Sequence, residues 1–244
     1  MSVLVNPPVT ALGTHNVLLQ GHARTYHVRD FPGPLSVKSV VRGEAWWETA
    51  DGRFHVEAGR YLILNHGQPY SITVESREEV ETLCAFFAEG FVEDVLRGLL
   101  TTSARLMEDP DLPPACGFLE SVRPLRAGVA TELLRMHAAL KEGSPPELWL
   151  EARFLGLARA LHAAERDLER EAARLPALRA STRAELYRRL RRARDFVDSS
   201  LDRKLSLAIV SRVACLSPYH FHRLFAAAFG ETLHAYIVRQ RLER

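Results

Sequence analysis

The sequence predicts an α+β protein, with a β-barrel or β-sandwich in its N-terminal half, a helical middle segment and an all-helical C-terminal unit. Residues 20–90 consist of short β-branched and aromatic runs separated by turn signals, and from about residue 91 the apolar residues recur at helical spacing. The charge is also unevenly distributed. Residues 177–244 carry 14 Lys and Arg against 6 Asp and Glu, a net charge of +8, whereas residues 1–176 carry −6. This asymmetry indicates a basic unit for a polyanion joined to an acidic unit.

The chain has 244 residues, which is enough for more than one domain. We expect a barrel domain at 1–95, a helical dimerisation or linker segment at 96–176 and a further domain at 177–244. Hydrophobic residues make up 47% of the chain and charged residues 25%, which is typical of a soluble globular protein.

The sequence also predicts a cytoplasmic protein without a membrane partner. Pro7 and Pro8 break the short apolar run at the start, and no window approaches the length of a membrane span. The cysteines, Cys84, Cys116 and Cys215, are far apart and form no C-x-x-C pair, which favours buried thiols in a reducing compartment.

The N-terminal half contains a series of predicted short strands. Residues 35–41 and 45–49 mix alternation with β-branched and aromatic side chains, and Asp51-Gly52 is typical of a tight hairpin. Further strands are expected at 54–57, 61–64, 70–74 and 81–87. Strands this short and this often interrupted favour a sandwich or a small barrel over a parallel sheet.

Helices are expected at 91–100, 127–142 and 146–172. In the last of these the predicted buried stripe is Leu148, Leu150 (or Ala152), Leu155, Ala158, Leu161 and His162. The end of this helix, residues 165–171, is charged nearly all round and is expected to be exposed, and residues 175–181 are expected to form a linker.

Two short helices joined by a tight turn are predicted near the C-terminus. Ser206 is a helix N-cap, and Ser217 is a second N-cap followed by proline at the first helical position. Gly230 ends the second helix and Thr232 caps the next one. With the turn at residues 215–216, this arrangement predicts a helix-turn-helix.

The second of these helices has two distinct faces. Phe221, Leu224, Phe225 and Ala228 form one buried stripe, and the opposite face holds Tyr219, Arg223 and Ala226, with His222 on its flank. Arginine can bind guanine O6 and N7, and tyrosine can pack on a thymine methyl group or bind a phosphate. This pattern predicts contact with the DNA major groove, the alternative being an ordinary helical hairpin with a polar outer face. Arg191 and Arg192 on the preceding helix are expected to attract phosphates.

The motif Leu216-Ser-Pro-Tyr-His-Phe-His-Arg-Leu-Phe, followed by Phe229-Gly-Glu-Thr and Tyr236…Arg241-Leu-Glu-Arg, resembles the first helix-turn-helix of the AraC/XylS family of transcription regulators. The resemblance covers about residues 183–244. It implies that Tyr219, His222 and Arg223 contact bases and that Ser217 and His220 contact phosphates. The chain departs from the family pattern in having Ser211 for alanine, Cys215 for glycine and Leu233 for proline.

The family's DNA-binding module contains two helix-turn-helix units joined by a long helix, which would begin here near Thr232. The sequence ends at Arg244, before a second unit. The chain is therefore expected to be either a truncated product or a one-unit variant. This opens an alternative function, that of a sensor or dimerisation protein without independent DNA binding.

Residues 25–87 resemble a cupin-like sensor barrel through Val41-Arg-Gly-Glu-Ala-Trp-Trp-Glu, Asp51-Gly, Val56-Glu-Ala-Gly-Arg-Tyr-Leu-Ile-Leu-Asn and Pro69-Tyr-Ser-Ile. Enzymatic cupins bind a metal through an H-x-H pair, a glutamate and a later histidine. Here the H-x-H pair is missing and Tyr70 occupies the later histidine position, so we expect no metal and no cofactor. The spacing of His22, His27, His55 and His66 fits no metal motif.

Trp46 and Trp47 are adjacent on a predicted strand, so one side chain should face inward and the other outward. The inward one either lines an apolar ligand pocket or fills the barrel. Trp46, Trp47 and Tyr70 are the candidate ligand-binding residues.

Together these observations predict a sequence-specific DNA-binding transcription regulator that responds to a small-molecule effector and is not an enzyme. Its expected partners are double-stranded DNA and the effector. The family resemblance also implies a second copy of the chain as a partner, bound through the helices near 127–172, although these helices could instead cover the barrel within one chain. A further alternative is a metal-dependent cupin enzyme with an unrelated helical tail, which the missing H-x-H pair disfavours.

Overall fold

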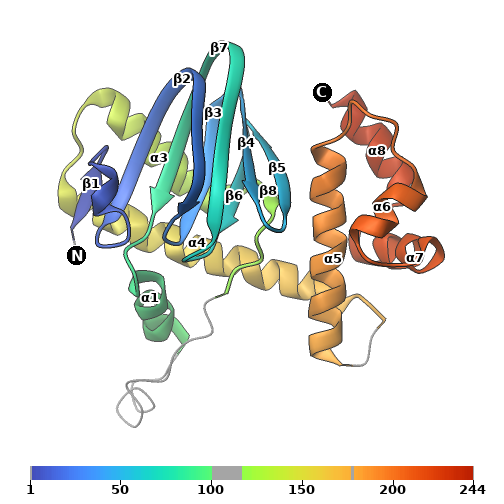
Figure 1. The fold of residues 1–244 in the computed structure, drawn as a ribbon. Coiled ribbons are helices and arrows are strands. Elements are labelled where there is room, and N and C mark those ends of the chain that lie inside the picture. Colours follow the sequence, from blue (N-terminus) through green and yellow to red (C-terminus); the bar gives the residue numbers. More distant parts are fainter. Residues whose placement is uncertain (1, 101–116, 177–178, 244) are drawn as a thin grey trace.

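The computed structural model describes residues 2–100, 117–176 and 179–243. It contains an N-terminal β-barrel, a pair of long helices and a C-terminal group of helices, so the α+β prediction is confirmed (Figure 1). Cys116 lies outside the described residues.

The barrel is built from one eight-stranded sheet in the order β1-β2-β7-β3-β6-β8, with β4 paired to both β5 and β7. The strands are β1 (Val3–Val5), β2 (Asn16–Pro32), β3 (Ser36–Arg42), β4 (Glu44–Thr49), β5 (Gly52–Glu57), β6 (Arg60–Leu64), β7 (Pro69–Phe86) and β8 (Val122–Pro124). The pairing of Thr49 with Gly52 confirms the predicted hairpin. The long strands β2 and β7 form an antiparallel ribbon that reaches both ends of the barrel.

Both faces of the central strands are buried, because side chains alternate between two apolar environments. Leu83 and Ala85 of β7 point toward the long helices, whereas Cys84 and Phe86 point into the barrel. Lys38 lies on the interior side of β3, between Val37 and Ser39. This alternation gives the barrel an inner core and an outer core.

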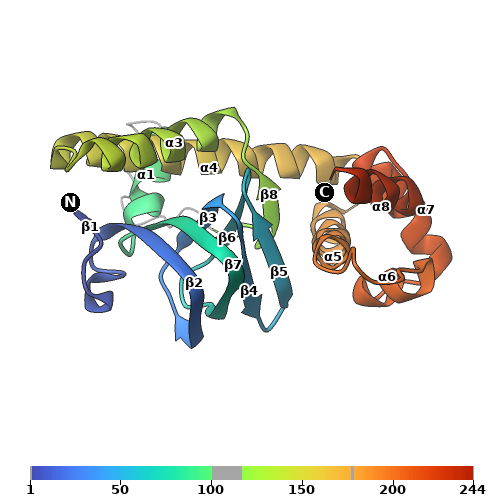
Figure 2. The same ribbon diagram turned by 90° about the horizontal axis from the view of Figure 1, so that it is seen from above.

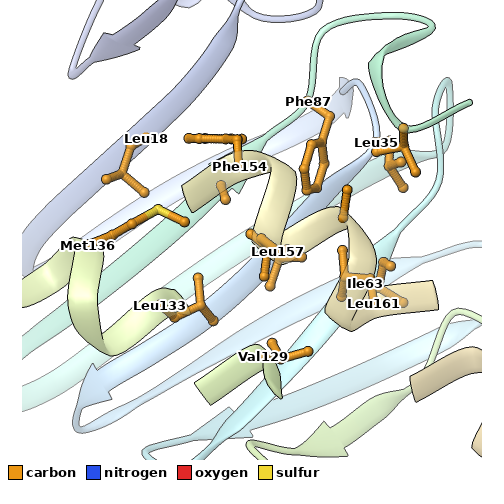
Figure 3. Packing of buried hydrophobic residues seen from close by; sticks show 14 of the residues in the cluster. Leu18, Leu35, Ile63, Phe87, Val129, Leu133, Met136, Phe154, Leu157 and Leu161 are labelled. Carbon is orange, nitrogen blue, oxygen red and sulfur yellow. The ribbon is translucent and has the colours of Figure 1, made fainter. Parts of the chain in front are cut away.

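The helices are α1 (Phe91–Leu100), α3 (Ala127–Glu142), α4 (Glu147–Ala173), α5 (Ala180–Asp198), α6 (Leu207–Val213), α7 (Pro218–Phe229) and α8 (Leu233–Leu242). Helices α3 and α4 lie side by side across the outer face of the sheet (Figure 2). Figure 3 shows their contact with the sheet, in which Met136, Phe154 and Leu157 meet Leu18, Ile63 and Phe87.

The predicted buried stripe of α4 is partly wrong. The residues that face the sheet are Leu150, Phe154, Leu157, Ala158 and Leu161. Leu148 is 78% exposed and Leu155 is 42% exposed. The true stripe follows i, i+4, i+7, i+8 and i+11 from Leu150, and Trp149 is partly buried beside it.

The charged end of α4 is also less exposed than the sequence suggested. Leu168 and Ala172 pack into the core of the C-terminal helices, and so does Leu175 in the predicted linker. Glu165 forms a 2.7 Å ion pair with Arg123, the middle residue of β8. One helix therefore contributes to two cores, first to that of the barrel and then to that of the C-terminal helices (Figure 1).

The domain limit drawn from the sequence at residue 95 falls within a helix, and the barrel sheet takes a strand from beyond it. Helix α1 spans position 95, and β8 adds a strand from the segment 96–176 to the barrel sheet. Within the described ranges, no helix combines the length and the apolar character needed to cross a bilayer.

Candidate DNA-binding helix and ligand cavity

Helices α6 and α7 form the predicted helix-turn-helix, and all the predicted caps are confirmed. The side chains of Ser206, Ser217 and Thr232 accept hydrogen bonds from the backbone N–H groups of Ile209, His220 and Ala235, at 3.3, 3.3 and 3.2 Å. Gly230 ends α7 in the left-handed conformation, with a φ of 75°. These bonds fix where each short helix begins and ends.

The turn between the two helices contains Cys215 with a φ of 53°. This conformation carries some strain, because a side chain disfavours the left-handed region. The turn closes through hydrogen bonds from the N–H groups of Cys215 and Leu216 to the carbonyl groups of Arg212 and Ser211, at 2.9 and 3.0 Å. Ser211 is buried, and its hydroxyl group donates to the carbonyl of Ala208 at 3.3 Å.

Helix α7 buries the predicted stripe and exposes the predicted polar set. Phe221, Leu224, Phe225 and Ala228 are buried. Tyr219 is 76% exposed, and Ser217, His220, His222 and Arg223 are exposed as well. The Ser217 oxygen already accepts the capping bond, so its hydroxyl proton is the part that remains for a phosphate.

The prediction for Arg191 is wrong. This side chain is 3% exposed and donates to the Ser121 hydroxyl and the Val122 carbonyl, at 3.1 and 2.9 Å. Arg192 is half-exposed and forms an ion pair with Asp51 in the β4–β5 hairpin. Both arginines therefore hold α5 against the barrel. Arg191 is buried there and is not accessible to DNA.

A second contact between the barrel and the C-terminal helices was not predicted. Arg60 of β6 donates to Asp198 of α5 at 3.0 Å and to Gln240 of α8 at 2.7 Å. Tyr236 of α8 donates to the other oxygen of Asp198 at 2.5 Å and accepts from Arg194 at 3.0 Å. Burial raises the pKa of the Tyr236 hydroxyl, and the Asp198 carboxylate raises it further. Tyr236 therefore remains a donor in this network.

The barrel contains a cavity of about 320 Å³ among β2, β3, β4 and β7. Two of the three candidate ligand-binding residues, Trp47 and Tyr70, line it. Trp46 lies on the opposite face of β4, with its ring 4.4 Å from the ring of His55 and 4.1 Å from the guanidinium of Arg53. One tryptophan therefore faces in and the other out, as predicted, and Trp46 does not line the cavity.

The most unusual residue of the cavity is Lys38, which sequence reasoning missed. It is 1% exposed, and its Nζ atom donates to the Tyr70 hydroxyl at 2.8 Å. The same atom lies 3.7 Å from the centre of the Phe86 ring and 4.3 Å from that of Tyr70. Burial lowers the pKa of Lys38 to about 7, an effect opposed by the neighbouring Cys84. Its position in an alternating strand, between inward Ser36 and Val40, was the available signal.

A larger cavity, of about 470 Å³, lies between the barrel and helices α4 and α5. Its walls include the charged side chains Glu165, Glu169, Arg188 and Arg192. Because drug-sized ligands favour mainly apolar, concave sites, the barrel cavity is the better candidate for an organic ligand.

The histidines considered as metal ligands lie apart from one another. His22, His27 and His55 are next to Glu79, Glu75 and Glu44, at 3.8, 3.6 and 2.8 Å, and His66 borders the larger cavity. Over the described ranges, no group of three or more His, Cys, Asp or Glu side chains could hold a metal ion.

Comparison with known proteins gives two family matches. Residues 17–178 match the model of the AraC-like ligand-binding domain, and residues 197–237 match that of the bacterial regulatory helix-turn-helix proteins of the AraC family. The first match alone covers more than half of the chain.

Several solved structures show low similarity. ToxT from Vibrio cholerae O395, bound to (E)-4-(8-methylnaphthalen-1-yl)but-3-enoic acid, is 11% identical over 93% of this chain and 100% of its own, with a TM-score of 0.41. The AraC-like transcriptional activator CuxR is 17% identical over 93% of this chain and 76% of its own, with a TM-score of 0.38. A cupin superfamily protein from Desulfitobacterium hafniense is 14% identical over 30% of this chain and 64% of its own, with a TM-score of 0.25.

The family matches coincide with the two units seen in the structure, the barrel with α1, α3 and α4, and the helices that carry the helix-turn-helix. The chain belongs to the AraC family of transcription regulators, and it combines an AraC-like ligand-binding domain with an AraC-type DNA-binding helix-turn-helix.

Proposed function

We propose that this regulator contacts bases through helix α7 and that a small molecule bound in the barrel cavity controls it. The observation that carries this proposal is the exposed polar set of α7, held by a buried aromatic stripe within the AraC-type unit. We place its action in the cytoplasm and assign it no enzymatic activity.

On the DNA side, Arg223, Tyr219 and His222 are the base contacts. They project from one exposed side of α7, and a recognition helix of this kind inserts into the major groove. Ser217 and His220, at the start of the helix, are the phosphate contacts, because a helix N-terminus favours an anion.

On the effector side, the cavity wall formed by Trp47 and Tyr70 is the binding surface. Helix α4 contacts the barrel core and the helix-turn-helix core, and Arg60 connects β6 with α5 and α8. These two links would transmit a change in the barrel to the DNA-binding helices. We accordingly assign sensing to residues 1–95, dimerisation and linkage to 96–176 and DNA binding to 177–244.

We further propose a homodimer formed through the outer face of α3 and α4. Leu148 and Leu155 are exposed seven residues apart on α4, so they lie on the same side of the helix. Leu134 of α3 is 57% exposed. Exposed apolar residues grouped in this way are typical of an interaction surface.

Selection of bound duplexes from a random DNA pool tests the proposed function. The expected result is an enriched sequence motif, which the triple variant Tyr219→Ala/His222→Ala/Arg223→Ala no longer selects although it remains folded. The absence of any enriched motif with the native chain would favour the alternative of a sensor without independent DNA binding. Retention of the same motif by the triple variant would show that other residues contact the bases.

A further inference from the structure

We propose that the barrel cavity binds a hydrophobic carboxylic acid, whose carboxylate lies between the Lys38 ammonium and the Tyr70 hydroxyl. This inference rests on the proposed function in one respect, that the barrel cavity is the effector site. It names the chemical class of the effector from the residues that surround the cavity.

The walls of the cavity favour an apolar molecule. Its lining is dominated by aliphatic and aromatic side chains, among them Leu19, Val28, Trp47, Ile72, Val74 and Phe86. None of the lining residues is Asp or Glu. A volume of about 320 Å³ lies near the lower end of the range for small-molecule sites.

Lys38 introduces a positive charge without a negative partner. Its Nζ atom contacts the Tyr70 hydroxyl and the faces of two aromatic rings, and no carboxylate within the described ranges forms an ion pair with it. A buried charge is costly unless it is paired. A ligand carboxylate would supply the missing counter-charge, and each ion would replace part of the hydration that the other has lost.

Tyr70 provides a second donor next to the first. Its oxygen accepts from Lys38 Nζ at 2.8 Å, so the hydroxyl proton remains for another acceptor. The ring of Phe31 packs edge-on against the Tyr70 ring, with centroids 5.7 Å apart, and this contact helps to fix its direction. Two adjacent donors, one of them charged, suit the two oxygens of a single carboxylate.

Other ligand classes fit this cavity less well. A polyol would bury several hydroxyl groups against a mainly apolar wall, in which the polar side chains besides Lys38 and Tyr70 are those of Gln20, His22, Tyr26 and Thr82. An organic cation would meet the Lys38 ammonium. An aldehyde or ketone could condense with the neutral amine to an imine and release water, but that reaction would make no use of the second donor on Tyr70.

The test is calorimetric titration of the full chain with phenylbutyrate, naphthylacetate and decanoate, each compared with its own primary amide. We expect at least one acid to bind about tenfold or more tightly than its amide, since a charge-assisted hydrogen bond is about twice as strong as a neutral one. Lys38→Met should remove that difference by weakening the acid and leaving the amide unchanged. Tyr70→Phe should weaken the acid by a smaller factor.

Trp46→Phe is the matched control, because Trp46 lies on the other face of β4 and should leave both affinities unchanged. Thermal unfolding of each variant checks that it is folded. The inference is overturned if none of the acids binds, if the amides bind as tightly as the acids, or if Lys38→Met keeps the preference for the acid. If borohydride traps an aldehyde on Lys38 and none of the acids binds, the carboxylate inference is wrong and the ligand is a carbonyl compound that forms an imine with Lys38.

The outcome can be separated from that of the proposed function by measuring DNA affinity with and without each ligand. If the acids bind through Lys38 and DNA affinity does not change, the proposed ligand class is supported, but the proposal that the cavity controls DNA binding is wrong. If only the amides bind and DNA affinity changes, control by the cavity stands and the carboxylate fails.

Discussion

Two residues of this chain, Cys215 and Lys38, are in energetically unfavourable states that their positions explain. Cys215 takes a left-handed conformation because the short turn between α6 and α7 requires one, although glycine would take it with less strain. Lys38 has its ammonium among aromatic rings, where no carboxylate within the described ranges pairs with it. The strained backbone of Cys215 allows the short turn to form, and the buried amine of Lys38 provides the binding group of the proposed effector site.

The stability of the protein should depend on pH through Lys38. Its pKa is about 7 in the folded chain and near 10.5 in an unfolded one, so the folded state binds fewer protons between these values. Above pH 10.5 the amine is neutral in both states and does not reduce the free energy of unfolding. As the pH falls from 10.5 toward 7, the unfolded state takes up the proton first, and the free energy of unfolding decreases. Lys38→Met should therefore stabilise the protein by about 2–3 kcal/mol more at pH 6 than at pH 9.5.

Urea unfolding at the two pH values measures this difference. Lys204→Met is the control, because Lys204 is exposed and its substitution should have the same small effect at both. Equal effects of Lys38→Met at pH 6 and pH 9.5 would contradict the prediction.

Arg223 should determine specificity more than overall affinity. Arg223→Ala should cost about 1–3 kcal/mol on the preferred duplex and less on a scrambled one, where mainly its charge matters. Arg212 is an exposed arginine at the end of α6, and Arg212→Ala should weaken both duplexes alike.

Titration of both duplexes by fluorescence anisotropy at two salt concentrations provides the comparison. A loss that is equal on the two duplexes for Arg223→Ala would identify this side chain as a phosphate contact. In that case the base contacts would have to come from another part of the exposed face of α7.

At the scale of elements, α4 has three distinct surfaces. Leu150 to Leu161 face the sheet, Leu168 and Ala172 face the C-terminal helices, and Leu148 and Leu155 are exposed. The helical period alone could not separate the exposed leucines from the buried ones, because Leu148 and Leu155 also follow an apolar spacing. The position of the sheet decides which apolar residues of the helix are covered.

The exposed leucines of α4 give the prediction at this scale. The double variant Leu148→Glu/Leu155→Glu should be monomeric at protein concentrations where the native chain is a dimer, because like charges would face each other across a symmetric interface. Multi-angle light scattering measures the mass of each species. Leu242→Glu is the control, since Leu242 is 82% exposed on α8 and should leave the dimer intact. A native chain that is monomeric at tens of micromolar would contradict the proposed homodimer.

At the scale of the whole molecule, the barrel and the DNA-binding helices are held together by charged contacts as well as by α4. Arg60 pairs with Asp198, and their side chains are 20% and 8% exposed. Because the pair is largely removed from water, losing one partner leaves the other charge poorly solvated. This contact should therefore contribute to the stability of the assembly in a way that surface pairs do not.

Arg60→Ala should destabilise the chain by about 2–4 kcal/mol and increase hydrogen exchange in α5 and α8. Arg42→Ala is the matched control, because the Arg42–Glu79 pair is 60% and 50% exposed and should contribute less than about 1 kcal/mol. Chemical unfolding and hydrogen–deuterium exchange give the two measurements. Similar losses for the two variants would show that the contact between barrel and helices is not a stabilising link.

The sequence by itself determined the features that depend on neighbours along the chain. The caps at Ser206, Ser217 and Thr232, the hairpin at Asp51-Gly52 and the two faces of α7 follow from local hydrogen bonding and from the period of helix or strand. These interactions span only a few residues, so the residue types alone are sufficient to predict them. The exposure of Tyr219, His222 and Arg223 on α7 was predicted for the same reason, whereas Ala226 is only partly exposed.

Only the tertiary structure decided the features that join distant segments. Arg191 resembles a DNA-binding arginine in the sequence, but its partners are 69 and 70 residues away on the barrel. Lys38 becomes a buried cation only because β7 brings Tyr70 and Phe86 beside it, and Arg60 meets Asp198 across 138 residues. The environment of a charge depends on which segments surround it in space, and that is set by the packing of the whole chain.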